Sequence, residues 1–223
     1  MDGNRRFAKN IGIISDAGHF FGRDKVEDVL NWCLEIGIKN LTLYAFSTEN
    51  FNRPKQEVNR LMEICRNELT NALNDQRIHK NQVKVKVIGH LGSLPKDVQT
   101  AAKTLMAQTK QYTRHTLTIA LAYGGREEIV QAIQKIAEDV KNNVLDIGHI
   151  NEKKVSSYLY TTGVPDPDLI LRTSGEERIS NFLLWQMAYS EFYFSDVYWP
   201  ALTKRDFLRA IRTYQIRKRR YGR

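Results

Sequence analysis

The sequence has few cysteines and no long apolar run, and both features exclude classes of protein. Its two cysteines, Cys33 and Cys65, form no CxxC pair and have no histidine at ligand spacing, which argues against a zinc site or a disulfide framework. Both lie at apolar positions of helical patterns, so we expect reduced core residues. No apolar run approaches the roughly 20 residues that span a bilayer, and no signal peptide pattern opens the sequence. We therefore expect a cytoplasmic protein.

The composition otherwise indicates a globular protein with anionic partners. The chain has 223 residues, 42% of them apolar, which is enough to bury a core without metal or disulfides. No linker or repeat divides it, so we expect one domain over residues 1–223. The 34 Lys and Arg against 25 Asp and Glu give a net charge of +9, which suits phosphorylated small molecules, nucleic acid or an acidic membrane surface. Charge alone leaves these three open.

Helical spacing of apolar residues alternates along the chain with short β-branched runs. The pattern predicts helices at 22–37, 55–80, 96–112, 126–142, 151–160 and 204–219, and strands at 41–46, 83–88, 116–123 and 169–172. This alternation predicts an α/β fold with a central, mainly parallel sheet flanked by helices. Such sheets bind ligands outside the carboxyl ends of their strands, and a polar or glycine-bearing segment follows each predicted strand.

The opening segment, Asp2 to Lys9, combines a carboxylate, a glycine, an asparagine and a run of cations. Arginines and free backbone N–H groups can hold phosphate oxygens, and a carboxylate such as Asp2 can hold Mg²⁺ against them. The same residues also suit an ordinary structural turn. By itself, this segment leaves the choice open.

A second cluster runs from Arg172 to Asn181, directly after the last predicted strand. Two guanidiniums, from Arg172 and Arg178, and the hydroxyl of Ser180 suit a diphosphate. The alternative is a surface loop with ion pairs to the neighbouring glutamates.

Five separated segments together resemble the undecaprenyl diphosphate synthase family of cis-prenyltransferases. Besides the two clusters, they are Gly18-His19, the stretch from Tyr44 to Pro54, and Tyr123-Gly124-Gly125-Arg126. They occur in the family's order, and the similarity covers nearly the whole chain. The aspartate-rich DDxxD box of trans-prenyltransferases, the GxxxxGK[ST] loop and the GxGxxG fingerprint are all missing from the sequence.

The resemblance implies that isopentenyl diphosphate condenses with an allylic prenyl diphosphate, with Mg²⁺ as cofactor. Asp2 would be a catalytic residue and a ligand of the metal. The donor diphosphate would be held by Gly3, Asn4, Arg5, Arg6 and His19. His19 has a plainer alternative as a cap of the helix that follows it.

The isopentenyl diphosphate would be held by Arg172, Arg178 and Ser180, and Glu191 would be a second ligand of Mg²⁺. Two further catalytic residues, Ser47 and Asn50, would orient groups for proton removal. Neither is a good base, so the resemblance leaves the final proton acceptor open between released diphosphate and water. Glu191 has an alternative as the partner of a surface cation.

The family builds a hydrophobic tunnel for the growing chain between the sheet and the early helices. The candidates here are Leu61, Met62, Cys65 and Leu69. Because apolar residues at helical spacing usually belong to the core, each of these residues has a plain structural alternative.

The closing Arg220-Tyr221-Gly222 resembles a family motif that reaches into the partner subunit's active site. Arg220 and Gly222 would therefore join the acceptor site of a homodimer. The hydrophobic polyprenyl product is compatible with peripheral contact between the enzyme and a membrane, although the sequence shows no dedicated anchor.

Two departures from the family concern the donor site. Ser15 stands where the family usually has an arginine, so one cation expected to grip the donor diphosphate is missing. The family also has an apolar strand before the first motif, and the sequence here starts at that motif. We therefore expect this protein to differ from other family members mainly in its donor diphosphate site.

Two other functions compete with this interpretation. A non-catalytic subunit of a heteromeric cis-prenyltransferase would be expected to lack Asp2 and the arginine pair, which are present. A nucleic-acid-binding protein would use the basic cluster at the end of the sequence, with affinity that falls steeply with salt. This cluster consists of Arg212, Arg217, Lys218, Arg219, Arg220 and Arg223. We favour the enzyme, with no nucleic acid partner.

Overall fold

The computed structural model describes residues 1–14 and 17–217, and the chain forms two compact units. The first unit comprises Met1–Gly37, Asp166–Ile179 and Gln186–Arg223, and the second comprises Ile38–Pro165 and Ser180–Trp185. Each unit is therefore assembled from segments far apart in the sequence. The expectation of one domain over the whole chain stays a prediction.

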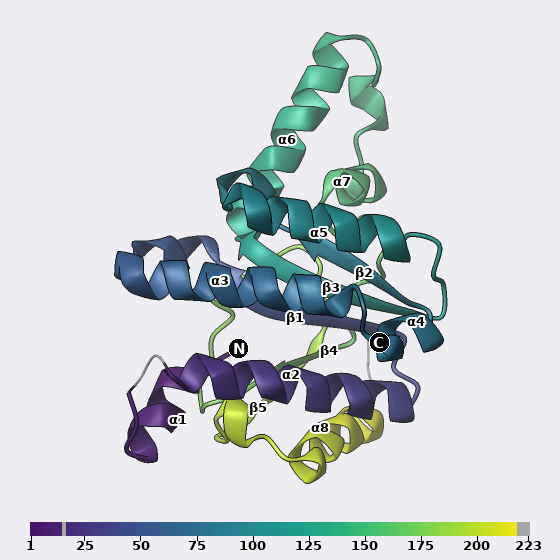
Figure 1. Ribbon diagram of the computed structural model, residues 1–223. Helices are drawn as coiled ribbons and strands as arrows, with labels where there is room; N and C mark the ends of the chain where they lie inside the picture. The colour runs from purple at the N-terminus through teal and green to yellow at the C-terminus, as the bar shows by residue number, and fades with distance from the viewer. Residues whose placement is uncertain (15–16, 218–223) are drawn as a thin grey trace. The chain divides into compact units, whose positions relative to one another are not determined.

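The second unit is built on a three-stranded parallel sheet. Its order is β1 (Asn40–Ser47), β3 (His115–Tyr123) and β2 (Val83–Ile88), with the most apolar strand in the middle. Helices α3 (Lys55–Ala72) and α5 (Lys96–Thr109) run side by side over the sheet (Figure 1). Apolar strand residues and the inner faces of these helices form the core. The register of β1 against β3 is irregular near Phe46, at the carboxyl end where polar loops begin.

The remaining elements of the second unit are one long helix and several short ones. They are η2 (Thr48–Asn52), α4 (Gln76–Lys80), η3 (Leu91–Ser93), α6 (Gly125–Lys141), η4 (Ile147–His149) and α7 (Glu152–Tyr158). The prediction of a single helix over 55–80 is wrong. The chain leaves α3 after Ala72, and the Asp75 side chain accepts a hydrogen bond from the Arg77 N–H (2.8 Å), which starts a new helix.

Within its described residues, the first unit contains two adjacent parallel strands and three α-helices. The elements are α1 (Asn4–Asn10), α2 (Gly18–Glu35), β4 (Leu169–Arg172), β5 (Glu191–Phe194), η5 (Trp199–Ala201) and α8 (Lys204–Ile216). The buried Trp199 indole donates to the Gly22 carbonyl oxygen (2.7 Å), which fixes η5 against α2. The rings of Trp32 and Phe207, 5.7 Å apart, join α2 to α8.

These observations confirm the α/β class with parallel strands between helices. Strand β5 was missed because its aromatic run reads equally well as irregular core. Cys33 and Cys65 are free thiols, as expected, and burial raises the pKa of each to about 12. No helix within residues 1–14 and 17–217 is long and apolar enough to cross a membrane.

Candidate active site

In the first unit, the opening motif is bound to the end of β4. The Arg172 guanidinium donates to the Asp2 carboxylate (2.8 Å), and the Thr173 hydroxyl donates to the Asp2 carbonyl oxygen (3.0 Å). The Trp199 N–H donates to the same carbonyl oxygen (3.1 Å). Three contacts to one residue hold Asp2 in place, while its side chain remains 41% exposed. The carboxylate is therefore both fixed and accessible.

Gly3 lies in a space that no side chain could share. A Cβ built on it would meet the Ser174 hydroxyl oxygen at 2.2 Å and the Tyr198 ring at 2.8 Å, and its φ of +98° is left-handed. Ser174 itself has a φ of 76°. Glycine is the residue that tolerates both the crowding and the backbone conformation.

Asn4 is enclosed by the first turns of α2. A Cβ on Gly18 would lie 1.9 Å from the Asn4 carbonyl oxygen, and one on Gly22 would lie 2.4 Å from its side-chain oxygen. These glycines let α2 pack directly on Asn4, and His19 follows Gly18 in the same turn. Within the described residues, the Asn4 side-chain oxygen and the Ser174 hydroxyl oxygen are buried without a hydrogen-bond partner. Such atoms are uncommon and are often satisfied by a ligand or water.

Glu176 links arginines from the two motifs. One carboxylate oxygen pairs with Arg6 (2.7 Å), and the other accepts a hydrogen bond from Arg178. Partial desolvation pushes the pKa of the Glu176 carboxyl upward, but Arg178 and Arg6 outweigh it and hold that pKa below its ordinary value. The Arg6 guanidinium also lies over the Tyr198 ring, 5.5 Å from its centroid. Two arginines from distant parts of the sequence are thus held by one carboxylate.

In the second unit, Ser47 and Asn50 form the start of η2. The Ser47 N–H donates to the Asn50 side-chain oxygen (3.2 Å), which closes the turn directly after β1. This is the contact of a helix cap, and it gives both residues a structural task. Their proposed part in proton removal stays a prediction.

Asn181 connects three segments of the second unit. Its side chain accepts from the Arg126 N–H (2.9 Å) and donates to Glu49 (2.8 Å), and its carbonyl oxygen accepts from the Gly125 N–H (2.7 Å). The pKa of the Glu49 carboxyl is lowered overall. Burial alone would raise this pKa, but hydrogen bonds, including those from Asn181 and Ser47, outweigh the effect of burial. The loops after β1 and β3 are therefore held together by one asparagine.

Ser180 begins the same segment in a left-handed conformation, with a φ of 46°. Its carbonyl oxygen accepts a hydrogen bond from the Tyr44 hydroxyl (3.4 Å), which also donates to the Tyr123 carbonyl oxygen (3.1 Å). The hydroxyl group of Ser180 itself is exposed at the surface of the loop. The structure therefore anchors the backbone of Ser180 and leaves its side chain accessible.

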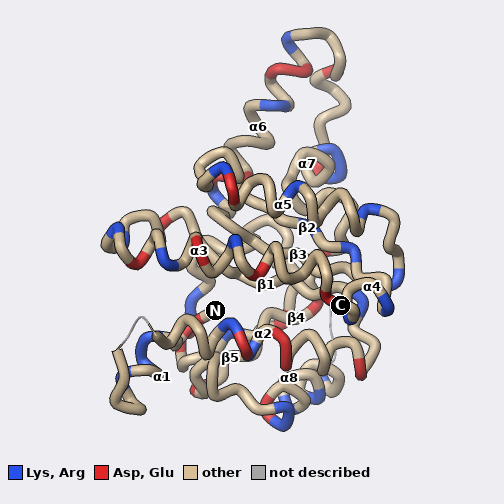
Figure 2. Tube along the Cα trace, viewed as in Figure 1, with Lys and Arg blue, Asp and Glu red and all other residues tan. Residues whose placement is uncertain are grey.

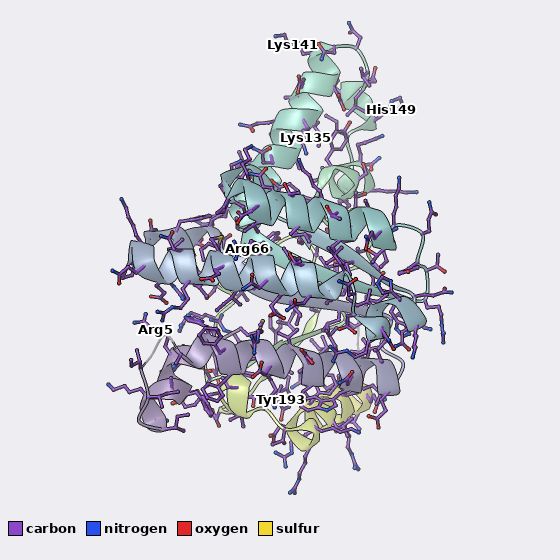
Figure 3. All side chains as sticks on the ribbon, viewed as in Figure 1. Arg5, Arg66, Lys135, Lys141, His149 and Tyr193 are labelled. Atoms are coloured by element: carbon purple, nitrogen blue, oxygen red, sulfur yellow. The ribbon has the colours of Figure 1, made fainter. Side chains whose placement is uncertain are left out.

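Other candidates have mixed placements. Glu191 pairs with Arg217 (2.9 Å), the plainer role considered for it, and its metal role stays a prediction. Met62 and Leu69 are buried in α3, whereas Leu61 and Cys65 are partly exposed, and their place in a tunnel also stays a prediction. Arg5 is exposed on α1 (Figure 3). Ser15, Arg220 and Gly222 lie outside the described residues.

Two residues that organise these clusters were not among the predicted site residues. The sequence predicts Glu176 only as an ion-pair partner in a surface loop, and Asn181 only as the last residue of the second cluster. The sequence signal for Glu176 is its position two residues before Arg178, which allows an ion pair between them. For Asn181 no local signal exists, because its side-chain partners are 55 and 132 residues away.

The fold and these clusters define a class of protein: an α/β enzyme whose arginines and carboxylate gather after a parallel strand. A family profile described as putative undecaprenyl diphosphate synthase matches residues 1–222. The chain belongs to this family, and the prediction of a cis-prenyltransferase is confirmed.

Curated relatives agree over the whole chain. A tritrans,polycis-undecaprenyl-diphosphate synthase (geranylgeranyl-diphosphate specific) from Picrophilus torridus is 53% identical over 99% of this chain and 87% of its own length. A protein of the same name from Methanocaldococcus jannaschii is 50% identical over 100% of this chain and 80% of its own length. Such similarity to named synthases supports an enzyme rather than a non-catalytic subunit.

Solved structures agree on the fold. Lavandulyl diphosphate synthase from Lavandula x intermedia, in complex with dimethylallyl diphosphate, has a TM-score of 0.93 at 34% identity and covers 100% of this chain and 95% of that one. A probable undecaprenyl diphosphate synthase from Campylobacter jejuni has a TM-score of 0.79 at 35% identity, covering 91% and 92%.

Proposed function

We propose that this prenyltransferase condenses isopentenyl diphosphate with an allylic prenyl diphosphate, in the presence of Mg²⁺, to make a cis-polyprenyl diphosphate. Geranylgeranyl diphosphate is the proposed allylic substrate, because curated relatives at about half identity over the whole chain are named as specific for it. The observation that carries the proposal is a double link between the motifs. Asp2 pairs with Arg172, and Glu176 joins Arg6 to Arg178.

In the reaction, the bond between C1 of the allylic chain and its diphosphate oxygen breaks. The double bond of isopentenyl diphosphate supplies the electron pair for the new bond to C1. A proton then passes from C2 of the former isopentenyl unit to the released diphosphate or to a water molecule. The departing diphosphate gathers negative charge, which the Arg6 guanidinium and the side-chain N–H of Asn4 would stabilise. Arg172 and Arg178 would orient the second diphosphate so that its double bond faces C1.

The residues present fit a magnesium ion. Asp2 offers a fixed, accessible carboxylate oxygen, and magnesium is usually held by one or two carboxylates together with substrate phosphates. No group of three or more His, Cys, Asp or Glu residues that could hold a metal occurs in the part of the chain that the structure describes. The bound ion would neutralise charge on the diphosphate.

The proposal includes a homodimer, in which the Arg220-Tyr221-Gly222 segment completes the partner's site. This rests on the family resemblance of the segment. A symmetric dimer needs only one kind of chain, because each subunit supplies both the motifs and the segment.

The test is an incubation with labelled isopentenyl diphosphate and allylic diphosphates of one to four isoprene units, with and without Mg²⁺. We expect long polyprenyl products, most rapidly from geranylgeranyl diphosphate, and none when the metal is chelated. Dimethylallyl diphosphate alone is a useful additional arm, because a structural relative was solved with it. No product from any pair by a folded enzyme would overturn the proposal.

A matched pair of variants links the activity to the site. Asp2→Asn keeps a side-chain oxygen for Arg172 but removes the charge, so we expect kcat to fall by about 10² or more. Asp24→Asn removes an exposed carboxylate that pairs with Arg23 and should leave kcat unchanged. Equal activity of the two variants would contradict the role of Asp2.

A further inference from the structure

We propose that the first unit carries a surface that docks on an anionic lipid bilayer. The docking surface consists of an apolar set, Ile11, Ile13, Ile14, Phe20 and Phe21, with a basic rim of Arg5, Lys9 and Arg23. The proposed function explains why membrane binding would be useful, because a polyprenyl product partitions into membranes; only this part of the proposal rests on that function. The surface itself is argued from exposure and charge.

The apolar part is unusual in its density. The exposed fractions are 49% for Ile11, 37% for Ile13, 79% for Ile14, and 43% and 42% for the two phenylalanines. Single exposed apolar side chains are ordinary, but a group of this size in a stretch of 11 residues marks an interaction surface. Helix α2 packs on α1 through Gly18 and Gly22, and the Phe21 ring lies 5.6 Å from the Phe7 ring of α1.

The charge near these residues is net positive, with Arg5, Arg6, Lys9 and Arg23 against Asp16 and Asp24 over residues 5–24. Residues 5–14 contain Arg5, Arg6 and Lys9 and no acidic residue, and Figure 2 shows basic positions along α1. Arg5 and Lys9 are exposed on α1, and Arg6 pairs with Glu176. Arg23 lies 5.9 Å from the Phe20 ring centroid and also pairs with Asp24. Apolar side chains next to cations are the combination that anionic bilayers bind.

This charge distribution favours a bilayer over a second copy of the chain. Two copies meeting through this surface would bring like-charged rims together, which opposes association. Another exposed apolar set, Val144 and Ile147 beyond α6, has one neighbour of each sign, Lys141 and Asp146, and so has no net positive rim. It provides a matched control, because Ile147 (74%) is nearly as exposed as Ile14.

Docking through this surface would bring the donor site to the bilayer. Asn4 and Arg6 lie on α1 and His19 lies in the first turn of α2, the same elements that carry the apolar set. A growing polyprenyl chain would therefore be made beside the phase that dissolves it.

The experiment is co-sedimentation of the full chain with extruded vesicles, without substrate, at about 0.1 M salt, where surface charges still act. Vesicles of equal phosphatidylcholine and phosphatidylglycerol should bind the protein, and pure phosphatidylcholine should bind about tenfold less. The double variant Ile11→Ser/Ile14→Ser, and separately Lys9→Glu, should each weaken binding by about fivefold or more. Val144→Ser/Ile147→Ser should bind like the unmodified protein.

Three outcomes overturn the proposal: no binding to either vesicle, equal loss from the control variant, or a dimer in sedimentation velocity that only Ile11→Ser/Ile14→Ser dissociates. The last outcome would assign the surface to a second copy. Circular dichroism checks that each variant folds. Synthase activity in detergent separates the two proposals, because Ile11→Ser/Ile14→Ser should retain it, and its absence from the unmodified protein would count against the function alone.

Discussion

The Glu176 carboxylate holds two arginines that the family resemblance assigns to different substrates. Arg6 belongs to the donor motif and Arg178 to the acceptor motif, and each pairs with one oxygen of the same carboxylate. The charge of Glu176 can therefore set the position of both guanidiniums before substrates bind. Such preorganisation makes oriented binding of both diphosphates easier.

We predict that Glu176→Gln raises KM for both diphosphates together, by about three- to tenfold, because both arginines lose their common partner. Glu177→Gln is the matched control, since the neighbouring side chain is exposed and should change neither KM. Steady-state kinetics with each substrate varied in turn provides the measurement. A change confined to one substrate would show that the link between the arginines does not matter.

A second prediction at the residue scale concerns the stability cost of replacing Gly3, and Gly12 provides the control. Both have a positive φ, but a Cβ on Gly12 would meet nothing within 4 Å in the described structure, whereas one on Gly3 would strike Ser174 and Tyr198. Gly12→Ala should therefore cost about 1 kcal/mol, from the backbone conformation. Gly3→Ala should cost more and reduce kcat, because Asp2 is displaced.

The double variant Gly3→Ala/Ser174→Gly removes one of the two clashes and should recover part of the stability, as measured by denaturant unfolding. Glycine also suits the left-handed φ of Ser174. Additive losses in the double variant would mean that the hydroxyl does not limit the space at Gly3.

At the scale of elements, the break between α3 and α4 depends on Asp75. Its side chain caps α4 and also pairs with the Arg77 guanidinium (2.6 Å). The Arg77 hydrogen bond is the main cause that lowers the pKa of the Asp75 carboxyl, against a smaller opposing effect of burial. Because Ile78 of α4 is buried and α4 contacts β2, the cap contributes to the second unit.

We predict that Asp75→Ala lowers the free energy of unfolding by about 1 kcal/mol at neutral pH. A lowered folded-state pKa gives stability that is complete above the unfolded-state value of about 4 and is lost as pH falls through the folded-state value. The difference between the two proteins should therefore shrink in acid. Asp75→Asn keeps a capping oxygen and should lose less, and an equal loss would assign the whole effect to charge.

The elements that could be predicted from sequence are those with local signals. Strand 83–88 was predicted with its observed bounds, because alternating valines and lysines lie between polar turns. The 55–80 helix was wrong because apolar spacing continues across Asn74 and Asp75, where the aspartate cap overrides it. Strand β5 needed its pairing with β4 to be recognised, and such pairing leaves no local trace.

The same distinction explains the site. Asp2 and Arg172 could be selected through family motifs, but their contact spans 170 residues of sequence. No periodicity or spacing encodes such a contact. The organising roles of Glu176 and Asn181 depend on tertiary neighbours in the same way, so they emerged only from the structure.

At the scale of the whole molecule, part of the net charge of +9 can be assigned to particular sites. Of the 34 Lys and Arg residues, Arg6 and Arg178 pair with Glu176, and three more form the basic rim of the proposed docking surface. The alternative of nucleic acid binding gains no support from these placements. The remaining question for the whole molecule is whether each active site of the proposed homodimer contains residues from both chains.

The last prediction tests that sharing by mixing inactive variants. If Arg220 acts in the partner's site, a mixed dimer of Asp2→Asn and Arg220→Ala subunits contains one site with both residues intact. Random exchange makes half of the dimers mixed, so about a quarter of all sites should be active. We expect the mixture, after unfolding and joint refolding, to recover about a quarter of the unmodified activity, while each variant refolded alone stays inactive. If Arg220 acts within its own chain, every site lacks one of the two residues, and the mixture gains nothing over its parts.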